Sequence, residues 1–296
     1  MSTKSSEKIE KIEKNSFDKN EVLNDYKLAN LSRQISLMGR KEVLTGKAKF
    51  GIFGDGKEIA QIALAKNFKD GDWRSGYYRD QTFMMAAGLF SAEEFFAQLY
   101  GQTDVALNPG NGGRSFNNHF STRSLNSDGS WKDLTKQKNS SSDISPTAGQ
   151  MARWVGLAYA SKLFRNNKEL HQFTTLSNKG NEVAFGTIGD ASTSEGQFWE
   201  AMNAVGVLQV PAVIAVWDDG YGISVPKKYQ TTKESISELL KGFERTKDKP
   251  GIVIFKGKGW DYPGLIKLFN EGVEIARKEH VPVVFHIDEI TQPQGH

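Results

Sequence analysis

The stretch TIGDASTSEGQFWEAMNAVGVLQVPAVIAVWDDGYGISVP, residues 187–226, decides the expected fold of this chain. It contains an apolar run that ends at Asp190, a Ser/Thr cluster, a helix-like segment, and a second apolar run that ends at Asp218 and Asp219. This order is typical of two parallel strands joined by a crossover helix. Because parallel strands end at the same edge of a sheet, we expect these carboxylates to converge in the crevice beyond the strand ends.

The segment between the two runs carries helix-start signals. Ser192 with Glu195, and Ser194 with Gln197, both match the capping box and predict a helix N-terminus just after Asp190. Helix N-termini attract phosphate, and facing carboxylates without nearby His or Cys favour magnesium or calcium. Spacing alone supports two hypotheses equally, a metal–diphosphate site and a plain β-α-β unit whose Asp residues only cap and turn.

The rest of the chain places this unit in a larger α/β protein. Strand-like runs alternate with helical segments from the middle of the chain onward, which indicates a three-layer fold with a mainly parallel sheet flanked by helices. The predicted strands are EVAFGTI, AVIAVW, GIVIFK and VPVVFHI. Helices are expected at residues 25–46, in GKEIAQIALAKNF, and in SAEEFFAQLYG, where Ser91 and Glu94 form a capping box. Residues 102–146 are rich in Gly, Ser and Asn and are expected to be irregular.

Composition excludes several classes of protein. The 296 residues carry a net charge of only +3, with scattered Lys and Arg, which argues against nucleic acid as a main partner. No apolar run reaches the about 18–20 residues of a membrane span, and the polar N-terminus predicts no signal peptide. The absence of cysteine excludes disulfides, thiolate metal sites and a cysteine nucleophile. We expect a cytoplasmic protein in which residues 1–25 form a flexible arm rich in Lys and Glu.

Several motifs together resemble one family. GDASTSEG followed by WDDGYGISVP resembles the thiamine diphosphate motif, and SGYYRDQT, SSDISPTAGQ and the terminal EITQPQGH extend the match. The chain, from about residue 31 to residue 296, resembles the alpha subunit of the thiamine diphosphate-dependent 2-oxo acid dehydrogenases, branched-chain type. It is equally similar to the alpha part of a fused alpha/beta chain. The resemblance implies that residues 26–296 form a thiamine diphosphate-binding domain.

The resemblance assigns roles to individual residues. It implies that Mg²⁺ is held by the side chains of Asp190 and Asp219 and by the backbone carbonyl of Tyr221. It implies two active-site histidines, His296 and, from the NNHF segment, His119. The cofactor-binding residues that it implies are Tyr78, Arg79, Ser145, Thr147, Gly189, Asp190, Ala191, Ser192, Asp219, Tyr221, Gly222 and Ile223.

Three features depart from the family pattern. The family usually has Gly where Ala191 stands and Asn where Asp219 stands. A second carboxylate beside an anionic diphosphate is expected to weaken cofactor binding. The sequence also stops at His296, where the family continues, so we expect the domain to lack the family's C-terminal part.

The expected activity is oxidative decarboxylation of a 2-oxo acid, with acyl transfer to a lipoylated acyltransferase. A beta subunit or fused beta domain is expected to complete the site, and branched-chain substrates are preferred over pyruvate or acetoin. A second hypothesis is a non-catalytic cofactor-binding or scaffold subunit, supported by Asp219 and the early end of the sequence. A metal-dependent phosphotransferase is a third, although the chain has no P-loop.

Alternative structural roles apply to some of these residues. Taken without the resemblance, Arg79 is expected in a surface salt bridge and His119 in a solvated loop. His280 and His286 are expected to be structural, since one ends a basic helix and the other alternates within a strand.

Overall fold

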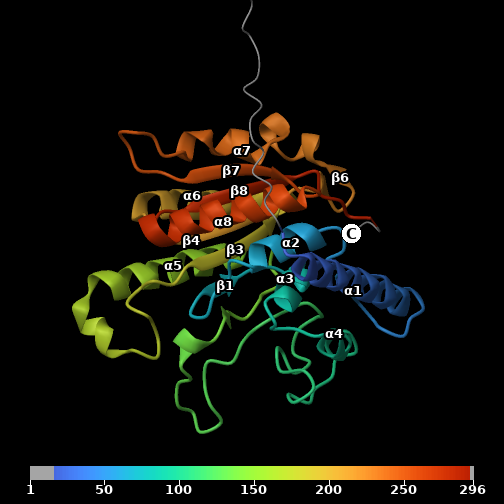
Figure 1. Ribbon diagram of the computed structural model, residues 1–296. Coiled ribbons are helices and arrows are strands. Elements are labelled where there is room, and N and C mark those ends of the chain that lie inside the picture. Colours follow the sequence, from blue (N-terminus) through green and yellow to red (C-terminus); the bar gives the residue numbers. More distant parts are fainter. Residues whose placement is uncertain (1–16, 294–296) are drawn as a thin grey trace, which may run out of the picture.

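The computed structural model describes residues 17–293 and contains one six-stranded sheet with helices on both faces (Figure 1). All strand pairs in the sheet are parallel, in the order β2-β1-β3-β4-β8-β7. The strands are β1 (Trp73–Ser75), β2 (Asn139–Ser140), β3 (Ala184–Gly189), β4 (Ala212–Trp217), β7 (Val253–Lys258) and β8 (Val283–Asp288). The expected α/β fold with a parallel sheet is therefore confirmed.

The helices predicted at residues 25–46, 56–68 and 91–101 all form, whereas the short helix at residues 81–86 was not predicted. The α-helices are α1 (Lys19–Leu44), α2 (Glu58–Ala65), α3 (Gln81–Ala86), α4 (Ala92–Leu99), α5 (Gln150–Asn166), α6 (Gly196–Leu208), α7 (Ile236–Leu239) and α8 (Tyr262–Glu279). Helix α1 begins six residues before the predicted start, because Asp18 caps it by accepting a hydrogen bond from the backbone N–H of Glu21 at 2.9 Å. It therefore extends into the expected arm, whose residues 1–16 lie outside the described part of the chain.

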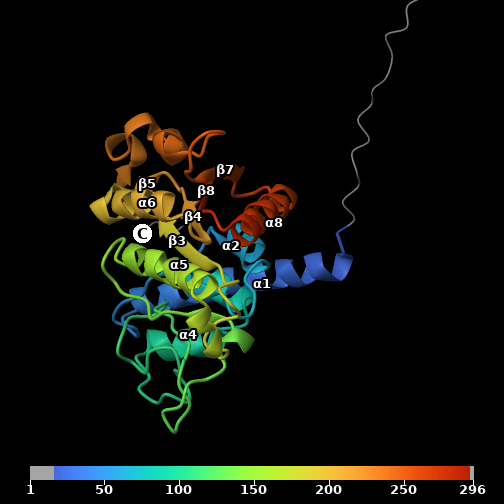
Figure 2. The ribbon, with the colours of Figure 1, turned by 90° about the vertical axis from the view of Figure 1, so that its left-hand side faces the viewer.

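The two faces of the sheet bury two separate hydrophobic clusters. Along β4, Val213, Ala215 and Trp217 face α2, α3 and α8, whereas Ile214 and Val216 face α5 and α6. This alternation is the two-residue period of a strand that is buried on both sides. Figure 2 shows the resulting three layers, with α5 and α6 on one side of the strands and α2 and α8 on the other.

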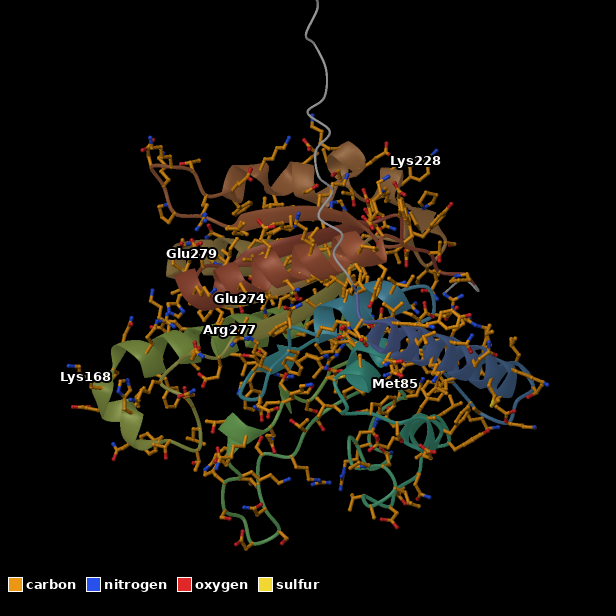
Figure 3. The ribbon with its side chains drawn as sticks, in the orientation of Figure 1. Met85, Lys168, Lys228, Glu274, Arg277 and Glu279 are labelled. Atoms are coloured by element: carbon orange, nitrogen blue, oxygen red, sulfur yellow. The ribbon has the colours of Figure 1, made fainter. Side chains whose placement is uncertain are left out.

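Two strands of the sheet were not predicted from the sequence. The strands β1 and β2 are only three and two residues long, which is too short to show a hydrophobic period. Tertiary contacts hold β1 in place. Arg277 of α8, labelled in Figure 3, pairs with Asp72 at 2.7 Å, and Asp72 accepts a hydrogen bond from the backbone N–H of Val183.

The irregular segment predicted at residues 102–146 is also confirmed, since it contains only the strand β2 and one short 3₁₀-helix, Leu134–Lys136. Its buried side chains are largely amides and hydroxyls, including Asn108, Asn117 and Asn139. The side chain of Asn139, for example, donates to the backbone carbonyls of both Asp72 and Leu134. Side-chain hydrogen bonds therefore replace the regular backbone ladder in this part of the fold.

Within residues 17–293, no helix combines the length and apolar character that a membrane crossing requires.

Candidate functional site

The carboxylates predicted at the sheet edge converge there. Strands β3 and β4 are parallel neighbours, with Gly189 paired to Trp217, so Asp190 and Asp218 each follow the last pair of the ladder. The backbone N–H of Asp190 still donates to the carbonyl of Trp217 at 3.1 Å. Asp219 lies one residue farther along, at the start of the turn that leads into the hairpin β5 (Tyr221–Gly222) and β6 (Val225–Pro226).

The predicted start of the helix after Asp190 is wrong. A 3₁₀-turn, Ala191–Ser194, follows Asp190, and α6 begins only at Gly196. Glu195 is the N-cap and makes no side-chain capping bond, so neither predicted capping box forms. A capping serine needs extended backbone, and Ser192 and Ser194 lie inside the 3₁₀-turn instead. The tight turn brings the backbone of residues 191 and 192 to the cavity wall, where both residues are found.

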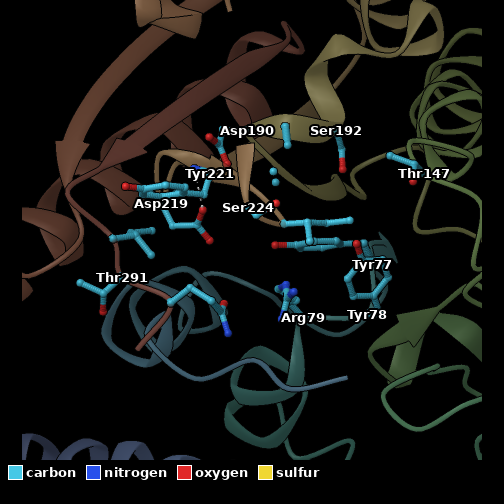
Figure 4. A pocket seen from close by; sticks show the side chains of 16 residues that line it. Tyr77, Tyr78, Arg79, Thr147, Asp190, Ser192, Asp219, Tyr221, Ser224 and Thr291 are labelled. Atoms are coloured by element: carbon cyan, nitrogen blue, oxygen red, sulfur yellow. Dashed lines mark hydrogen bonds between the residues drawn. The ribbon is translucent and has the colours of Figure 1, made fainter. Parts of the chain in front are cut away.

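A cavity of about 740 Å³ lies at this edge of the sheet (Figure 4). Of the cofactor-binding residues expected from the sequence, those that line it are Tyr78, Arg79, Thr147, Gly189, Asp190, Ala191, Ser192, Asp219, Tyr221, Gly222 and Ile223. The sequence-based assignment did not include Tyr77, Ser224, Ile290, Thr291 and Gln292, which line it too. Segments far apart in the sequence therefore meet in one cavity, as Figure 4 shows for Tyr78, Arg79, Asp190 and Asp219.

The histidines expected at the site are placed differently. His119 is buried away from the cavity wall, where its Nε2 lies 2.8 Å from the Oγ of Ser145 and its Nδ1 lies 3.2 Å from the carbonyl of Asn117. Ser145 and His119 are thus brought together, but neither lines the cavity. The expectation of a solvated His119 is wrong, because the ring is only 3% exposed. His296 lies outside the described residues.

Arg79 is buried, so the surface salt bridge expected for it without the family resemblance is wrong. Its guanidinium donates to the backbone carbonyl of Phe53 and lies 5.6 Å from the centre of the Tyr78 ring. Gln61 in turn donates to the carbonyl of Arg79 at 2.7 Å, which holds the backbone of this residue against α2. A guanidinium held in this way at a cavity wall is suited to bind an anion through paired hydrogen bonds.

Asp218 belongs to the support of the site and does not line the cavity. Its Oδ2 accepts from Lys227 at 2.9 Å and lies 2.9 Å from the Nε2 of His286. Burial alone would raise the pKa of Asp218, but the hydrogen bonds from His286 and Lys227 outweigh it and lower this pKa. His286 is itself buried on β8 and contacts Ser237 through Nδ1 at 3.0 Å, which fits the structural role expected for it.

Asp219 has a partner that the sequence did not indicate. Its Oδ2 lies 2.9 Å from the Nζ of Lys57, a lysine that is only 1% exposed. Burial lowers the pKa of Lys57, and the attraction of Asp219 opposes this shift. The two residues are 162 positions apart, and a pair at that separation leaves no local pattern from which it can be found.

Asp190 differs from both of its neighbours, since no ion pair involves it within residues 17–293. Burial, with a smaller contribution from the negative charges of Asp218 and Asp219, raises its pKa to about 8. A carboxylate that is buried beside two others and lacks a cation is a strong candidate for binding one.

The donor set fits a hard cation better than a transition metal. No group of three or more His, Cys, Asp or Glu side chains is arranged for metal binding in the described part of the chain. The set expected from the sequence is smaller, with two carboxylates and the Tyr221 carbonyl, and its members all line the cavity. Oxygen-only sites with few protein ligands are typical of Mg²⁺, which completes its shell with water and phosphate oxygens. Tyr77 adds a buried hydroxyl that finds no partner among the described residues.

Comparison with known proteins agrees with this geometry. A family model described as "Dehydrogenase E1 component" matches residues 26–288. The chain is 26% identical over 269 residues to the 2-oxoisovalerate dehydrogenase subunit alpha of Bacillus subtilis, covering 89% of this chain and 69% of that protein. It is 25% identical to the pyruvate dehydrogenase E1 component subunit alpha of Acholeplasma laidlawii, covering 90% and 63%.

The mitochondrial 2-oxoisovalerate dehydrogenase subunit alpha of Bos taurus is 25% identical, with 93% of this chain and 51% of the relative covered. The chain therefore spans about half to two thirds of the length of these relatives. Since the family model covers most of the sequence, the identification made from the motifs is confirmed, and the chain belongs to the dehydrogenase E1 component family.

Proposed function

We propose that this chain is the alpha part of a thiamine diphosphate-dependent 2-oxo acid dehydrogenase. The reaction is oxidative decarboxylation of a 2-oxo acid, with transfer of the acyl group to a lipoylated acyltransferase. The observation that carries the proposal is the convergence of Asp190, Asp219 and Tyr221 with Arg79 around one cavity at the carboxyl edge of the parallel sheet. Ligands of open parallel sheets bind at this edge.

The residues of the cavity fit a magnesium–diphosphate group. Asp190, Asp219 and the carbonyl of Tyr221 would hold Mg²⁺, and the cation would offset the burial and the repulsion that together raise the pKa of Asp190. The glycine at 189 keeps side-chain bulk away from the diphosphate. A Cβ there would lie 3.6 Å from the hydroxyl of Tyr77 and would narrow the cavity at this point.

The remaining cofactor contacts come from the two sides of the cavity. The backbone of Ala191 and Ser192 would approach the diphosphate, and the guanidinium of Arg79 would bind its oxygens. Thr147, Gly222 and Ile223 would line the rest of the cofactor. When bound, thiamine diphosphate supplies the carbon nucleophile and the electron sink for decarboxylation.

We propose that His119 is an active-site histidine whose ring is held by hydrogen bonds to neighbouring residues. Its contacts with Ser145 and the Asn117 carbonyl fix the orientation of the ring in the irregular segment. A histidine so held can move a proton at the substrate when the site is complete. His296 is proposed as the second such histidine.

The substrate and partners are part of the same proposal. We favour branched-chain 2-oxo acids, because the Bacillus subtilis and Bos taurus relatives are both named for 2-oxoisovalerate. The Acholeplasma laidlawii relative is named for pyruvate, which makes pyruvate the first alternative substrate to assay. A beta subunit or fused beta domain would complete the active site.

The hypothesis of a non-catalytic subunit loses one of its supports. One of its two supports was the additional negative charge of Asp219, and Lys57 lies 2.9 Å from that carboxylate.

Calorimetric titration of thiamine diphosphate in the presence of Mg²⁺ tests the proposal. The protein is used with its beta part, and wild type is compared with Asp190→Asn and with Asp288→Asn, a strand-end carboxylate outside the cavity lining. We expect saturable binding that is lost in Asp190→Asn and kept in Asp288→Asn. Absence of binding by the wild type would overturn the proposal, and preferential binding of a nucleoside triphosphate would favour a phosphotransferase instead.

A further inference from the structure

Lys57 is a buried lysine at the end of the loop that leads into α2. Its side chain is 1% exposed, and its Nζ donates to the Oδ2 of Asp219 and to the Oε1 of Gln292, both at 2.9 Å. A buried ammonium is unfavourable unless it is paired and hydrogen-bonded, so these two contacts are what permits a lysine at this position.

Cations at the sheet edge are matched to individual carboxylates. Lys227 neutralises Asp218 at 2.9 Å, and Lys57 neutralises Asp219 at the same distance. Among the described residues, no such cation pairs with Asp190. Among the described residues, Asp190 is therefore the one of the three carboxylates that keeps an uncompensated charge, and this edge of the sheet does not carry three such charges.

The pairing also assigns different tasks to the two oxygens of Asp219. Lys57 binds Oδ2, while Oδ1 accepts a hydrogen bond from the backbone N–H of Tyr221 at 3.2 Å. A carboxylate oxygen accepts more than one partner, so Oδ1 retains a lone pair for a cation. It lies on the same turn as the Tyr221 carbonyl, the other donor proposed for the metal.

Lys57 joins two segments of the cavity wall. Its second acceptor, Gln292, lies in the segment that contributes Ile290, Thr291 and Gln292 to the lining. The preceding Gly56 has a φ of +96°, and a Cβ there would overlap the carbonyl of Thr291. The turn before α2 and the segment after β8 are therefore in direct backbone contact, and the ammonium bridges that contact to Asp219.

We propose that Lys57 is a positioning residue of this site, which neutralises Asp219 and fixes Gln292 at the cavity wall. The pair of Lys57 and Asp219 then presents one liganding oxygen with no net charge, as a neutral amide would. The identity of the bound group rests on the proposed function, whereas the coupling of the two side chains does not.

The coupling is tested by urea unfolding of the intact protein in EDTA, with Lys57→Gln, Asp219→Asn and the double variant. Each single variant leaves one charge without its partner, the half-buried Asp219 or the buried Lys57, so we expect each to lower the urea midpoint. The double variant restores a neutral pair and is expected to unfold closer to wild type than either single variant. If Lys57→Gln does not fold but the double variant does, the rescue by the second substitution also demonstrates the coupling.

Additive losses in the double variant would overturn the coupling. Lys66→Gln serves as the matched control, because Lys66, at the other end of α2, is ion-paired with Glu21 and Asp25 of α1. Combined with Asp219→Asn, it should give additive shifts.

Titration with thiamine diphosphate at saturating Mg²⁺ tests the link to the cofactor. We expect Lys57→Gln to raise the Kd at least about tenfold, because Asp219 then repels the diphosphate, and the double variant to recover most of this loss. A Lys57→Gln protein that is folded and binds like wild type would show that Lys57 only stabilises the fold, and would overturn its role in the site. If wild type does not bind, the proposed function fails, the role of Lys57 toward the cofactor fails with it, and the unfolding data alone decide the coupling.

Discussion

At the scale of single residues, the site depends on how buried charges are balanced. Asp190, Asp218 and Asp219 lie together because two parallel strands end there, but their surroundings give them different properties. Hydrogen bonds from His286 and Lys227 lower the pKa of Asp218, whereas burial and its neighbours raise the pKa of Asp190 to about 8. Asp190 is therefore the carboxylate whose charge a bound cation would neutralise.

This difference predicts a pH dependence of stability in the metal-free protein. Because the pKa of Asp190 is raised from 3.8 to about 8 on folding, its stabilising contribution is fully present below about pH 4 and is lost as the pH rises through 8. Relative to Asp190→Asn, wild type should therefore lose at least about 1 kcal/mol of unfolding free energy between pH 5 and pH 8. Urea unfolding in EDTA at several pH values measures this, and parallel pH profiles for the two proteins would contradict it.

Arg74 carries the other buried charge network near the cavity. It is fully buried and pairs with Asp80 at 2.6 Å and with Asp143 at 3.0 Å. Replacing it with Met leaves two buried carboxylates without their cation, and we expect a loss of about 3–5 kcal/mol in unfolding free energy. Lys47→Met, at an exposed pair with Glu42, should change it by less than about 1 kcal/mol. Chemical denaturation of both variants decides whether burial or mere pairing governs the effect.

At the scale of elements, capping signals separate into one that forms and two that do not. Ser91 and Glu94 form the predicted capping box of α4, with hydrogen bonds of 3.2 Å and 2.8 Å. The same pattern at Ser192 and Ser194 fails, because the chain makes a 3₁₀-turn after Asp190 before α6 begins. The local sequence is compatible with a capped helix and with a 3₁₀-turn. The turn forms, and its residues Ala191 and Ser192 line the cavity.

The contrast predicts different costs for two similar substitutions. Ser91→Ala removes a side-chain acceptor from the first turn of α4 and should lower the unfolding free energy by about 1 kcal/mol. Ser194→Ala removes no capping bond and should change it by less than about 0.5 kcal/mol. Thermal or urea unfolding of the two variants makes the comparison, and equal losses would mean that Ser194 also caps a helix in solution.

At the scale of the whole molecule, close packing sets the distance between the helices and the sheet. Gly272 of α8 lies against the ring of Phe285 on β8, and a Cβ at Gly272 would overlap that ring. Gly156 of α5 is exposed and has no atom within 4 Å of such a Cβ. The two helical glycines therefore occupy opposite packing environments.

Alanine substitution should consequently have opposite effects at these two positions. Gly272→Ala must push α8 away from the sheet and should cost about 1–3 kcal/mol. Gly156→Ala meets open space and should stabilise the protein by about 0.5–1 kcal/mol, because alanine favours the helix. Melting temperatures of both variants test this, and destabilisation by Gly156→Ala would mean that α5 packs against something at that face.

The sequence by itself determined the order of strands and helices in the second half of the chain, because buried strands and amphipathic helices have strong local periods. It also determined the carboxylates at the ends of β3 and β4, since parallel strands end at one edge. Only the tertiary structure determined three features: the short strands β1 and β2, the 3₁₀-turn after Asp190, and the pairing of Lys57 with Asp219. These features depend on contacts between residues far apart in the chain, and the energy of such contacts leaves no periodic signal in the sequence around either partner.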